Sequence, residues 1–112
     1  MERFVVGDIV VVPFPFTDLS STRKRPALVL PNLEDDDIVI CEITSVMRKD
    51  AYVVPLENKD LESGKLRTDS IIRPNRILTI HTSKIQYQFG KVKDSKFQEV
   101  LEKIKIIFNL KI

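Results

Sequence analysis

Two short apolar runs near the N-terminus flank a polar segment that is rich in cations. The runs cover residues 8–12 and 27–30, and proline or polar residues bound each of them. Uninterrupted apolar runs of this length are typical of β-strands that are covered on both faces, so we expect a sheet between two apolar layers. The segment between the runs contains Arg23, Lys24 and Arg25. Because strands on either side can fix these cations, the segment is suited to gripping a phosphodiester.

Further β-rich runs follow along the chain. We predict extended segments at residues 38–44, 52–56, 70–73, 77–80 and 85–89. Pro55 indicates a strand end or a sheet edge for the second of these segments. Residues 74–76 separate the third segment from the fourth, and residues 62–65 have the composition of a turn.

The C-terminal segment has a different period. Apolar residues recur at helical spacing between Phe97 and Phe108, and Ser95 followed by Gln98 has the pattern of a capping box. This spacing predicts one amphipathic helix, whose apolar face must pack on the sheet or on a partner subunit. We therefore expect a small, strongly bent β-sheet or barrel with a C-terminal helix.

Length and composition limit the possible classes of protein. The 112 residues, 43% of them hydrophobic, fit a single domain over residues 1–112. We find neither a signal peptide nor an apolar run near the ~20 residues of a membrane span, and expect a cytoplasmic protein without membrane association. The lone cysteine, Cys41, excludes an intrachain disulfide and is expected to be buried. A formal net charge of +2 does not by itself indicate nucleic acid, and we interpret the acidic residues 34–37 as a solvated turn.

Several catalytic classes lack their characteristic residues. The sequence has no glycine-rich phosphate loop and no Cys/His cluster, and we place its one histidine, His81, at the surface or in a turn. Arginine and hydroxyl side chains remain as candidates. RNA supplies its own nucleophile, the 2′-hydroxyl, so Arg25 with Thr44 and Ser45 could support RNA cleavage without a metal or another cofactor.

A plainer interpretation of the same residues stays open. Arg25 could simply pair with Asp8 or Asp18, while Arg23 and Lys24 could simply keep the surface solvated. In that case the alternative function is a non-catalytic barrel that binds RNA or a peptide partner.

Four segments, in their order along the chain, resemble the signature of the MazF/PemK (Kid-like) toxin family. They are residues 7–10, 14–18, 25–29 and 43–45, and the similarity continues through residues 70–80, 84–92 and the terminal helix. The resemblance implies an SH3-like β-barrel with a C-terminal helix, and a homodimer. It also implies a metal-free endoribonuclease that cuts single-stranded RNA at short motifs, with a cognate antitoxin whose acidic C-terminal segment competes with the RNA.

The resemblance also assigns roles to individual residues. The family's catalytic arginine and first hydroxyl correspond to Arg25 and Thr44, with Ser45 as a neighbouring phosphate or hydroxyl contact. The family's later Arg-x-Asp site corresponds to Arg73 and Asn75, and an asparagine cannot act as a carboxylate base.

Two carboxylates are candidates for the missing base, namely Glu42 and Asp18. Glu42 shares strand parity with Thr44, which places both side chains on one face. Arg25 keeps its proton at neutral pH, so we expect it to stabilise the charge of the phosphorane. Unstacked bases would be contacted by aromatic and cationic side chains, for which the candidates are Phe16, Lys24, Arg48, Arg73 and Arg76. Asn75 is a further candidate for RNA binding, through its amide.

Overall fold

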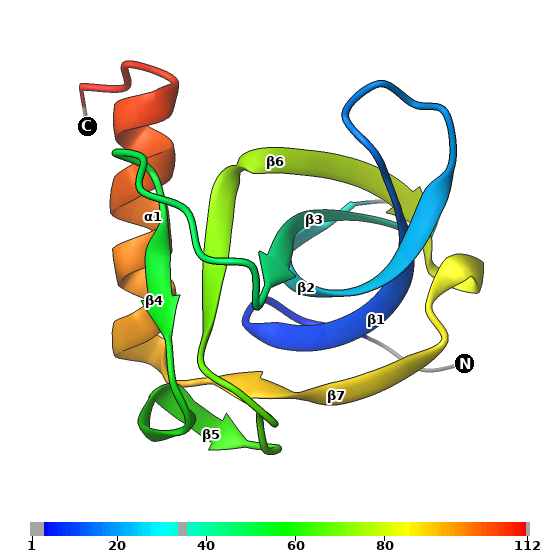
Figure 1. Cartoon of the computed structure of the whole chain (residues 1–112), viewed down its shortest axis with the longest axis horizontal. Helices are drawn as coiled ribbons and strands as arrows, with labels where there is room; N and C mark the ends of the chain where they lie inside the picture. The colour runs from blue at the N-terminus through cyan, green and yellow to red at the C-terminus, as the bar shows by residue number, and fades with distance from the viewer. Residues whose placement is uncertain (1–3, 34–35, 112) are drawn as a thin grey trace.

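A computed structural model describes residues 4–33 and 36–111, and within these ranges seven strands form one antiparallel sheet (Figure 1). The strands are β1 (Asp8–Pro15), β2 (Thr22–Asn32), β3 (Asp37–Thr44), β4 (Val54–Leu56), β5 (Leu61–Ser63), β6 (Ser70–His81) and β7 (Tyr87–Val92). Their order across the sheet is β4-β6-β3-β2-β1-β7-β5. The sheet curls into an incomplete barrel, with β4 and β5 at its two ends. The expected mainly β fold with a strongly bent sheet is confirmed.

One α-helix, α1 (Asp94–Ile107), follows β7 and packs beside the sheet, as the apolar spacing predicts (Figure 1). The predicted capping box at Ser95 and Gln98 is wrong. The helix begins directly after β7, so Lys93 takes the N-cap position without a side-chain cap bond, and Ser95 already lies in the first turn. No helix in the described ranges is long and apolar enough to cross a membrane.

The described residues also include two short 3₁₀ helices, η1 (Asn58–Asp60) and η2 (Thr82–Lys84). A capping box does occur at η1, where the Glu57 and Asp60 side chains each accept a hydrogen bond from the other residue's backbone N–H. His81 is exposed at the N-cap of η2, and its ring accepts a hydrogen bond from the backbone N–H of Ser83, which confirms the predicted surface position.

Apolar side chains cover both faces of the sheet. The layer inside the curled sheet contains Phe4, Val10, Val12, Phe14, Ala27, Val29, Ile38 and Ile40. The layer on the other face includes Ile9, Leu28, Cys41 and Ile43 from the sheet, and Phe97 and Val100 from α1. Neighbouring residues of one strand therefore serve opposite layers, which explains the uninterrupted apolar runs. Cys41 is fully buried, as expected.

The cationic segment is part of a strand. β2 begins at Thr22, earlier than the predicted start at residue 27, and residues 23–25 pair with residues 12–14 of β1. Apolar content alone places the boundary too late, because hydrogen bonding to β1 extends the strand into its polar end. The ladder therefore fixes these cations more firmly than a loop could.

The predicted break at residues 74–76 is a bulge within one long strand. The register between β3 and β6 passes from Glu42↔Arg73 to Cys41↔Ile77, so residues 74–76 have no regular partner on β3. The bulge bends β6 without ending it.

Three smaller predictions can also be compared with the structure. Residues 62 and 63 of the predicted turn belong to β5, and the chain turns at Gly64, which has a φ of 88°. The strand predicted at residues 85–89 starts later, at Tyr87, because η2 occupies the preceding segment. Pro55 is exposed on the edge strand β4, as expected, and residues 34–35 of the acidic turn lie outside the described ranges.

Candidate functional site

On β2 and β3, every second side chain faces the inside of the curled sheet. At one end of the sheet these inward-facing side chains change from apolar to polar on both strands. In β2, Arg25 continues the row of Ala27, and in β3, Glu42 and Thr44 continue the row of Ile40. The register pairs Ala27 with Glu42, which brings the polar ends of both rows together. The predicted common face of Glu42 and Thr44 is confirmed.

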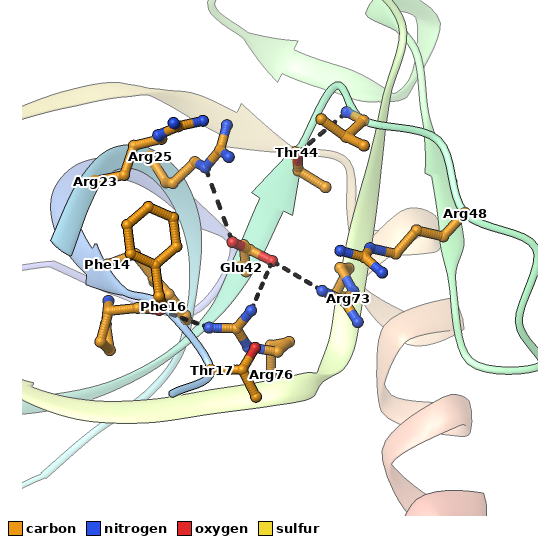
Figure 2. Close-up of a pocket in the computed structure, with 12 residues that line it drawn as sticks. Phe14, Phe16, Thr17, Arg23, Arg25, Glu42, Thr44, Arg48, Arg73 and Arg76 are labelled. Atoms are coloured by element: carbon orange, nitrogen blue, oxygen red, sulfur yellow. Dashed lines mark hydrogen bonds and ion pairs between the residues drawn. The ribbon is translucent and has the colours of Figure 1, made fainter. Parts of the chain in front are cut away.

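These polar ends open into a cavity of about 160 Å³, here called the arginine cavity (Figure 2). Its lining consists of Phe14, Pro15, Phe16, Thr17, Arg23, Arg25, Glu42, Thr44, Val46, Arg48, Arg73 and Arg76. Five guanidinium groups face one carboxylate in this lining. The cavity is therefore strongly cationic, and its chemistry suits an anionic ligand.

Glu42 lies at the centre of the cluster, between arginines from β2 and β6 (Figure 2). Its Oε1 lies 3.3 Å from Nη1 of Arg73 and 3.7 Å from Nη1 of Arg76. Its Oε2 lies 3.9 Å from Nε of Arg25, whose terminal nitrogens are directed away from the carboxylate. One buried carboxylate thus orients three guanidinium groups and compensates only part of their charge.

Aromatic rings support two of the arginines. The guanidinium of Arg76 lies 5.2 Å from the centre of the Phe14 ring, and its Nη2 donates a 2.6 Å hydrogen bond to the carbonyl of Pro15. The guanidinium of Arg23 lies 5.5 Å from the centre of the Phe16 ring. Such packing holds a guanidinium plane in place, where a nucleobase can stack on it.

The bulge in β6 explains how Arg73 and Arg76 reach the same cavity although they are three positions apart in a strand. Nε of Arg73 is buried and, among the described residues, has no hydrogen-bond partner. Arg73 therefore retains a donor that Glu42 does not satisfy.

The Thr44 side chain is buried at the end of β3, and its Oγ1 accepts a 3.1 Å hydrogen bond from the backbone N–H of Val46. A hydroxyl that accepts through one lone pair still has its proton to donate. The turn after β3 therefore fixes the oxygen and leaves the donor available for an anionic oxygen.

A second cavity, of about 200 Å³, adjoins the first and is here called the hydroxyl cavity. It is lined by Lys24, Arg25, Pro26, Thr44, Ser45, Leu66, Arg67, Thr68, Ser70 and Phe89. Arg25 and Thr44 line both cavities. The two residues from the predicted catalytic pair thus lie where the cavities meet.

The structure brings most of the predicted site residues into one of the two cavities. The arginine cavity contains Phe16, Arg25, Glu42, Thr44, Arg48, Arg73 and Arg76, and the hydroxyl cavity contains Lys24 and Ser45. Asn75 is exposed and lies outside both linings.

Asp18 also lies outside both linings. Its carboxylate accepts hydrogen bonds from the backbone N–H and the hydroxyl of Ser20, at 3.0 and 2.7 Å, which lower the pKa of Asp18 from its ordinary value. In the described part of the chain, no three side chains of His, Cys, Asp or Glu are grouped so that they could hold a metal ion.

Sequence reasoning missed several lining residues. Arg23 is exposed, as the plainer interpretation expected, but it also lines the arginine cavity two positions from Arg25, and strand alternation was the signal that could have found this. Residues 66–68, from the connection between β5 and β6, and Ser70, the first residue of β6, also line the hydroxyl cavity. No local pattern in the sequence reveals this placement, because it depends on pairing between β5 and β7.

The fold and the site together define a small curled β-sheet protein with a cationic cavity at one end of the sheet. Over residues 6–108 the chain matches the family described as the PemK-like, MazF-like toxin of type II toxin-antitoxin systems, and it belongs to that family. None of the curated proteins compared with it matches.

Three solved structures show the same fold. An endoribonuclease in complex with its cognate antitoxin, from a mycobacterial species, has a TM-score of 0.78 at 13% identity. The alignment covers 98% of this chain and 99% of the endoribonuclease chain. MazF in the MazE-MazF complex of Deinococcus radiodurans has a TM-score of 0.75 at 18% identity, with coverages of 96% and 98%. The Mycobacterium tuberculosis toxin MazF-mt6 has a TM-score of 0.71 at 20% identity, with coverages of 92% and 99%.

Proposed function

We propose that this toxin is a metal-independent, sequence-specific endoribonuclease that cuts single-stranded RNA in the cytoplasm by attack of the 2′-hydroxyl. The observation that carries the proposal is that Arg25 and Thr44 together line a cavity with five guanidinium groups. Endoribonuclease activity of a structural neighbour and membership of the toxin family support it.

In the proposed step, the 2′-oxygen forms a bond to phosphorus and the bond between phosphorus and the 5′-oxygen breaks. The products are a 2′,3′-cyclic phosphate and a 5′-hydroxyl. Arg25 stabilises the charge that develops on the non-bridging oxygens, and the Thr44 hydroxyl donates a hydrogen bond to the same phosphate. Ser45, directly after Thr44, contacts the neighbouring backbone or ribose hydroxyl.

We assign the 2′-hydroxyl proton to Glu42, the one carboxylate in either lining among the described residues. Its Oε2 is the acceptor, because Oε1 is nearer to Arg73 and Arg76. The leaving 5′-oxygen takes a proton from water, and Glu42 then releases its proton to solvent. Asp18 is the weaker candidate, since it lies outside both cavities and is bonded to Ser20.

The proposal is tested by incubating the purified protein with single-stranded RNA in excess EDTA, beside Arg25→Ala. We expect cleavage in EDTA and a loss of about 10²–10³-fold in rate for Arg25→Ala. Mass spectrometry of the fragments should show 2′,3′-cyclic phosphate ends. Lys59→Ala is the matched control, because Lys59 is a highly exposed cation outside both linings.

Loss of cleavage in EDTA, or full activity of Arg25→Ala, would overturn the metal-free arginine mechanism. Binding of RNA without any cleavage by the unmodified protein would instead indicate the non-catalytic alternative, a barrel that binds RNA or a peptide. Such binding would weaken with added salt, because phosphate contacts release counterions.

The proposed partners beyond RNA are a cognate antitoxin and a second copy of this chain. The cationic arginine cavity suits an acidic, disordered antitoxin segment, which would compete with RNA for the same groups. For the homodimer, the support is the exposed apolar end of α1 and the residues after it, at Ile106, Phe108 and Leu110. Light scattering coupled to size exclusion measures the mass, and a monomer at micromolar concentration would contradict the dimer.

A further inference from the structure

The connection between β3 and β4, residues 45–53, lines both cavities although little of the fold surrounds it. Val46 and Arg48 line the arginine cavity, and Ser45 lines the hydroxyl cavity. None of its residues belongs to a helix or a strand, and residues 45–52 are all exposed. Because conformational entropy opposes the ordering of an exposed backbone, the position of these side chains depends on the few contacts that hold the connection.

Two side chains brace the ends of the connection. At its start, Oγ1 of Thr44 accepts the hydrogen bond from the backbone N–H of Val46. Near its end, Oδ1 of Asp50 accepts hydrogen bonds from the backbone N–H groups of Tyr52 and Val53, at 2.9 and 3.1 Å. These bonds join residues two or three positions apart, so they shape local turns without tying the connection to the rest of the fold.

Lys103 of α1 supplies that tie. Its Nζ donates a 2.9 Å hydrogen bond to the carbonyl of Ala51. Within the described ranges, this is the one hydrogen bond between residues 45–53 and a distant element. Figure 1 shows the connection reaching α1 before β4 runs back beside the helix.

The surroundings of Lys103 leave it available for this bond. A groove of about 350 Å³ separates α1 from β4 and is lined by Val53, Val54, Pro55, Glu99, Glu102 and Lys103. Glu99 lies one turn before Lys103, at the spacing of a helical ion pair, but its carboxylate is 2.9 Å from Nζ of Lys96. Glu102 pairs with Lys105 at 3.0 Å. Both carboxylates are therefore committed elsewhere, and Lys103 reaches across the groove to the connection.

Arg48 is the cation of the arginine cavity that depends on this tie. Glu42 pairs with the three arginines that β2 and β6 carry, namely Arg25, Arg73 and Arg76. Arg48 enters the cavity from the connection instead (Figure 2), and no described carboxylate pairs with it. The direction of its side chain is therefore set by the backbone of the connection.

We propose that Lys103 is a positioning residue for the proposed cleavage reaction. It fixes the connection to α1 and thereby holds the guanidinium of Arg48 in the arginine cavity before RNA binds. Lys103 lines neither of the two cavities, so it acts through Arg48. Its loss should weaken RNA binding, because Arg48 must then be ordered on binding, and should leave the chemical step unchanged. This inference rests on the proposed function.

The experiment measures KM and kcat for cleavage of a single-stranded RNA by the unmodified protein and by Lys103→Met, Lys103→Arg and Lys105→Met. Methionine keeps the apolar length of the side chain without the ammonium donor, whereas arginine restores a cationic donor. Lys105→Met is the matched control, because it removes an equal charge from the same helix outside both cavities. We expect Lys103→Met to raise KM about fivefold at unchanged kcat, and the other two variants to stay within about twofold of the unmodified protein.

A double-mutant cycle with Arg48→Ala identifies the residue through which Lys103 acts. If Lys103 positions Arg48, then Lys103→Met should raise KM no further once Arg48 is replaced by alanine. The proposal is overturned if Lys103→Met raises KM by the same factor in both backgrounds, if it behaves as Lys105→Met does, or if it lowers kcat at unchanged KM.

Hydrogen exchange measures the tie without any RNA. In Lys103→Met, the backbone amides of Tyr52 and Val53 should exchange faster than in the unmodified protein, while those of β6 keep their rates. Unchanged exchange at Tyr52 and Val53 would show that Lys103 does not hold the connection, and would overturn the proposal.

Failure of the proposed function is visible separately. If the unmodified protein cuts no RNA, the same cycle is measured as Kd for a 2′-O-methyl RNA of mixed sequence, by fluorescence anisotropy. A loss for Lys103→Met that disappears in the Arg48→Ala background would then support the positioning role in RNA binding without cleavage. An equal loss in both backgrounds, or no binding by the unmodified protein, would overturn the inference together with the function.

Discussion

Arg73 donates a hydrogen bond from Nη1 to Oε1 of Glu42, over 3.3 Å and between two side chains that are about nine-tenths buried. The contact joins β6 to β3 at the point where the inner apolar layer gives way to the arginine cavity. Because Arg25 and Arg76 face the same carboxylate, Glu42 determines how three guanidinium groups are presented to a ligand.

The first prediction concerns the charge of this carboxylate. Glu42→Gln keeps the size of the side chain but leaves three guanidinium groups without their counterion. We expect the free energy of unfolding to fall by about 1–3 kcal/mol, measured by urea denaturation. If Glu42 accepts the 2′-hydroxyl proton, the cleavage rate should fall by about 10²–10⁴-fold as well.

Glu102→Gln is the control for this substitution. Glu102 pairs with Lys105 on the exposed face of α1, where an ion pair contributes about 0–1 kcal/mol. A Glu42→Gln protein with unchanged stability and unchanged cleavage would show that the cluster neither stabilises the fold nor takes part in the reaction.

The second prediction separates the two functions of Thr44. Thr44→Ser keeps the hydroxyl that accepts from Val46, and we expect it to cleave within about tenfold of the unmodified protein. Thr44→Val removes both the acceptor and the donor, and the expected loss is about 10²-fold or more in rate. Single-turnover cleavage measures the rate, and equal activity of the two variants would remove Thr44 from the mechanism.

The third prediction concerns Asn75, which takes the place of an aspartate in the family pattern. Its side chain is exposed and lies outside both cavities. We therefore expect Asn75→Asp and Asn75→Ala to cleave within about twofold of the unmodified protein, the usual range for surface changes. A gain of tenfold or more in Asn75→Asp would show that position 75 reaches the substrate.

Periodicity in the sequence was sufficient to predict the bent sheet and the terminal helix, whereas most of the residues that line the arginine cavity were named through the family resemblance. Residue parity on β3 places Glu42 and Thr44 together, and the same rule applied to β2 would have added Arg23. The bulge at residues 74–76 could not be predicted, since it exists only relative to the register with β3.

The hydroxyl cavity was also beyond prediction, for a related reason. Its lining combines the ends of β2 and β3 with residues 66–68 and Ser70, which follow the short strand β5 that pairs with β7. Leu66 is held by Asn58, a contact between side chain and backbone that no period in the sequence indicates. Local patterns determine which residues share a face, whereas long-range pairing determines which faces meet.

The fourth prediction tests that long-range pairing. A Cβ on Gly90 would collide with the carbonyl oxygen of Ser63 and lie 3.0 Å from Cα of Gly64, so β5 and β7 approach too closely for alanine. We expect Gly90→Ala to reduce the free energy of unfolding by about 1–3 kcal/mol, measured by urea denaturation. RNA binding should weaken in parallel, because the connection after β5, which lines the hydroxyl cavity with Lys24 and Ser45, must move.

Gly7→Ala is the comparison for this substitution. Unlike Gly90, Gly7 has a positive φ, of 89°, and a Cβ there would meet its nearest neighbour, Cγ2 of Val92, at an ordinary 3.7 Å. We expect Gly7→Ala to lower the free energy of unfolding by about 1–2 kcal/mol, because only the backbone conformation becomes strained, and to leave RNA binding unchanged. If both alanine variants bound RNA alike, the close approach of the strands would not control the hydroxyl cavity.

The fifth prediction follows from the burial of Cys41. Burial, with a smaller contribution from the charge of Glu42, raises the pKa of the Cys41 thiol far above its ordinary value of 9.0. The thiol should therefore resist Ellman's reagent at pH 8 in the native protein and react at once in guanidinium.

Above pH 9 the unfolded chain loses the thiol proton while the folded chain keeps it, so the free energy of unfolding falls as the pH rises. At pH 10 this contribution is about 1.4 kcal/mol, and Cys41→Ala should lose that much less stability than the unmodified protein between pH 7 and pH 10. Urea denaturation at the two pH values measures the difference, and equal alkaline losses would show that the thiol ionises within the fold.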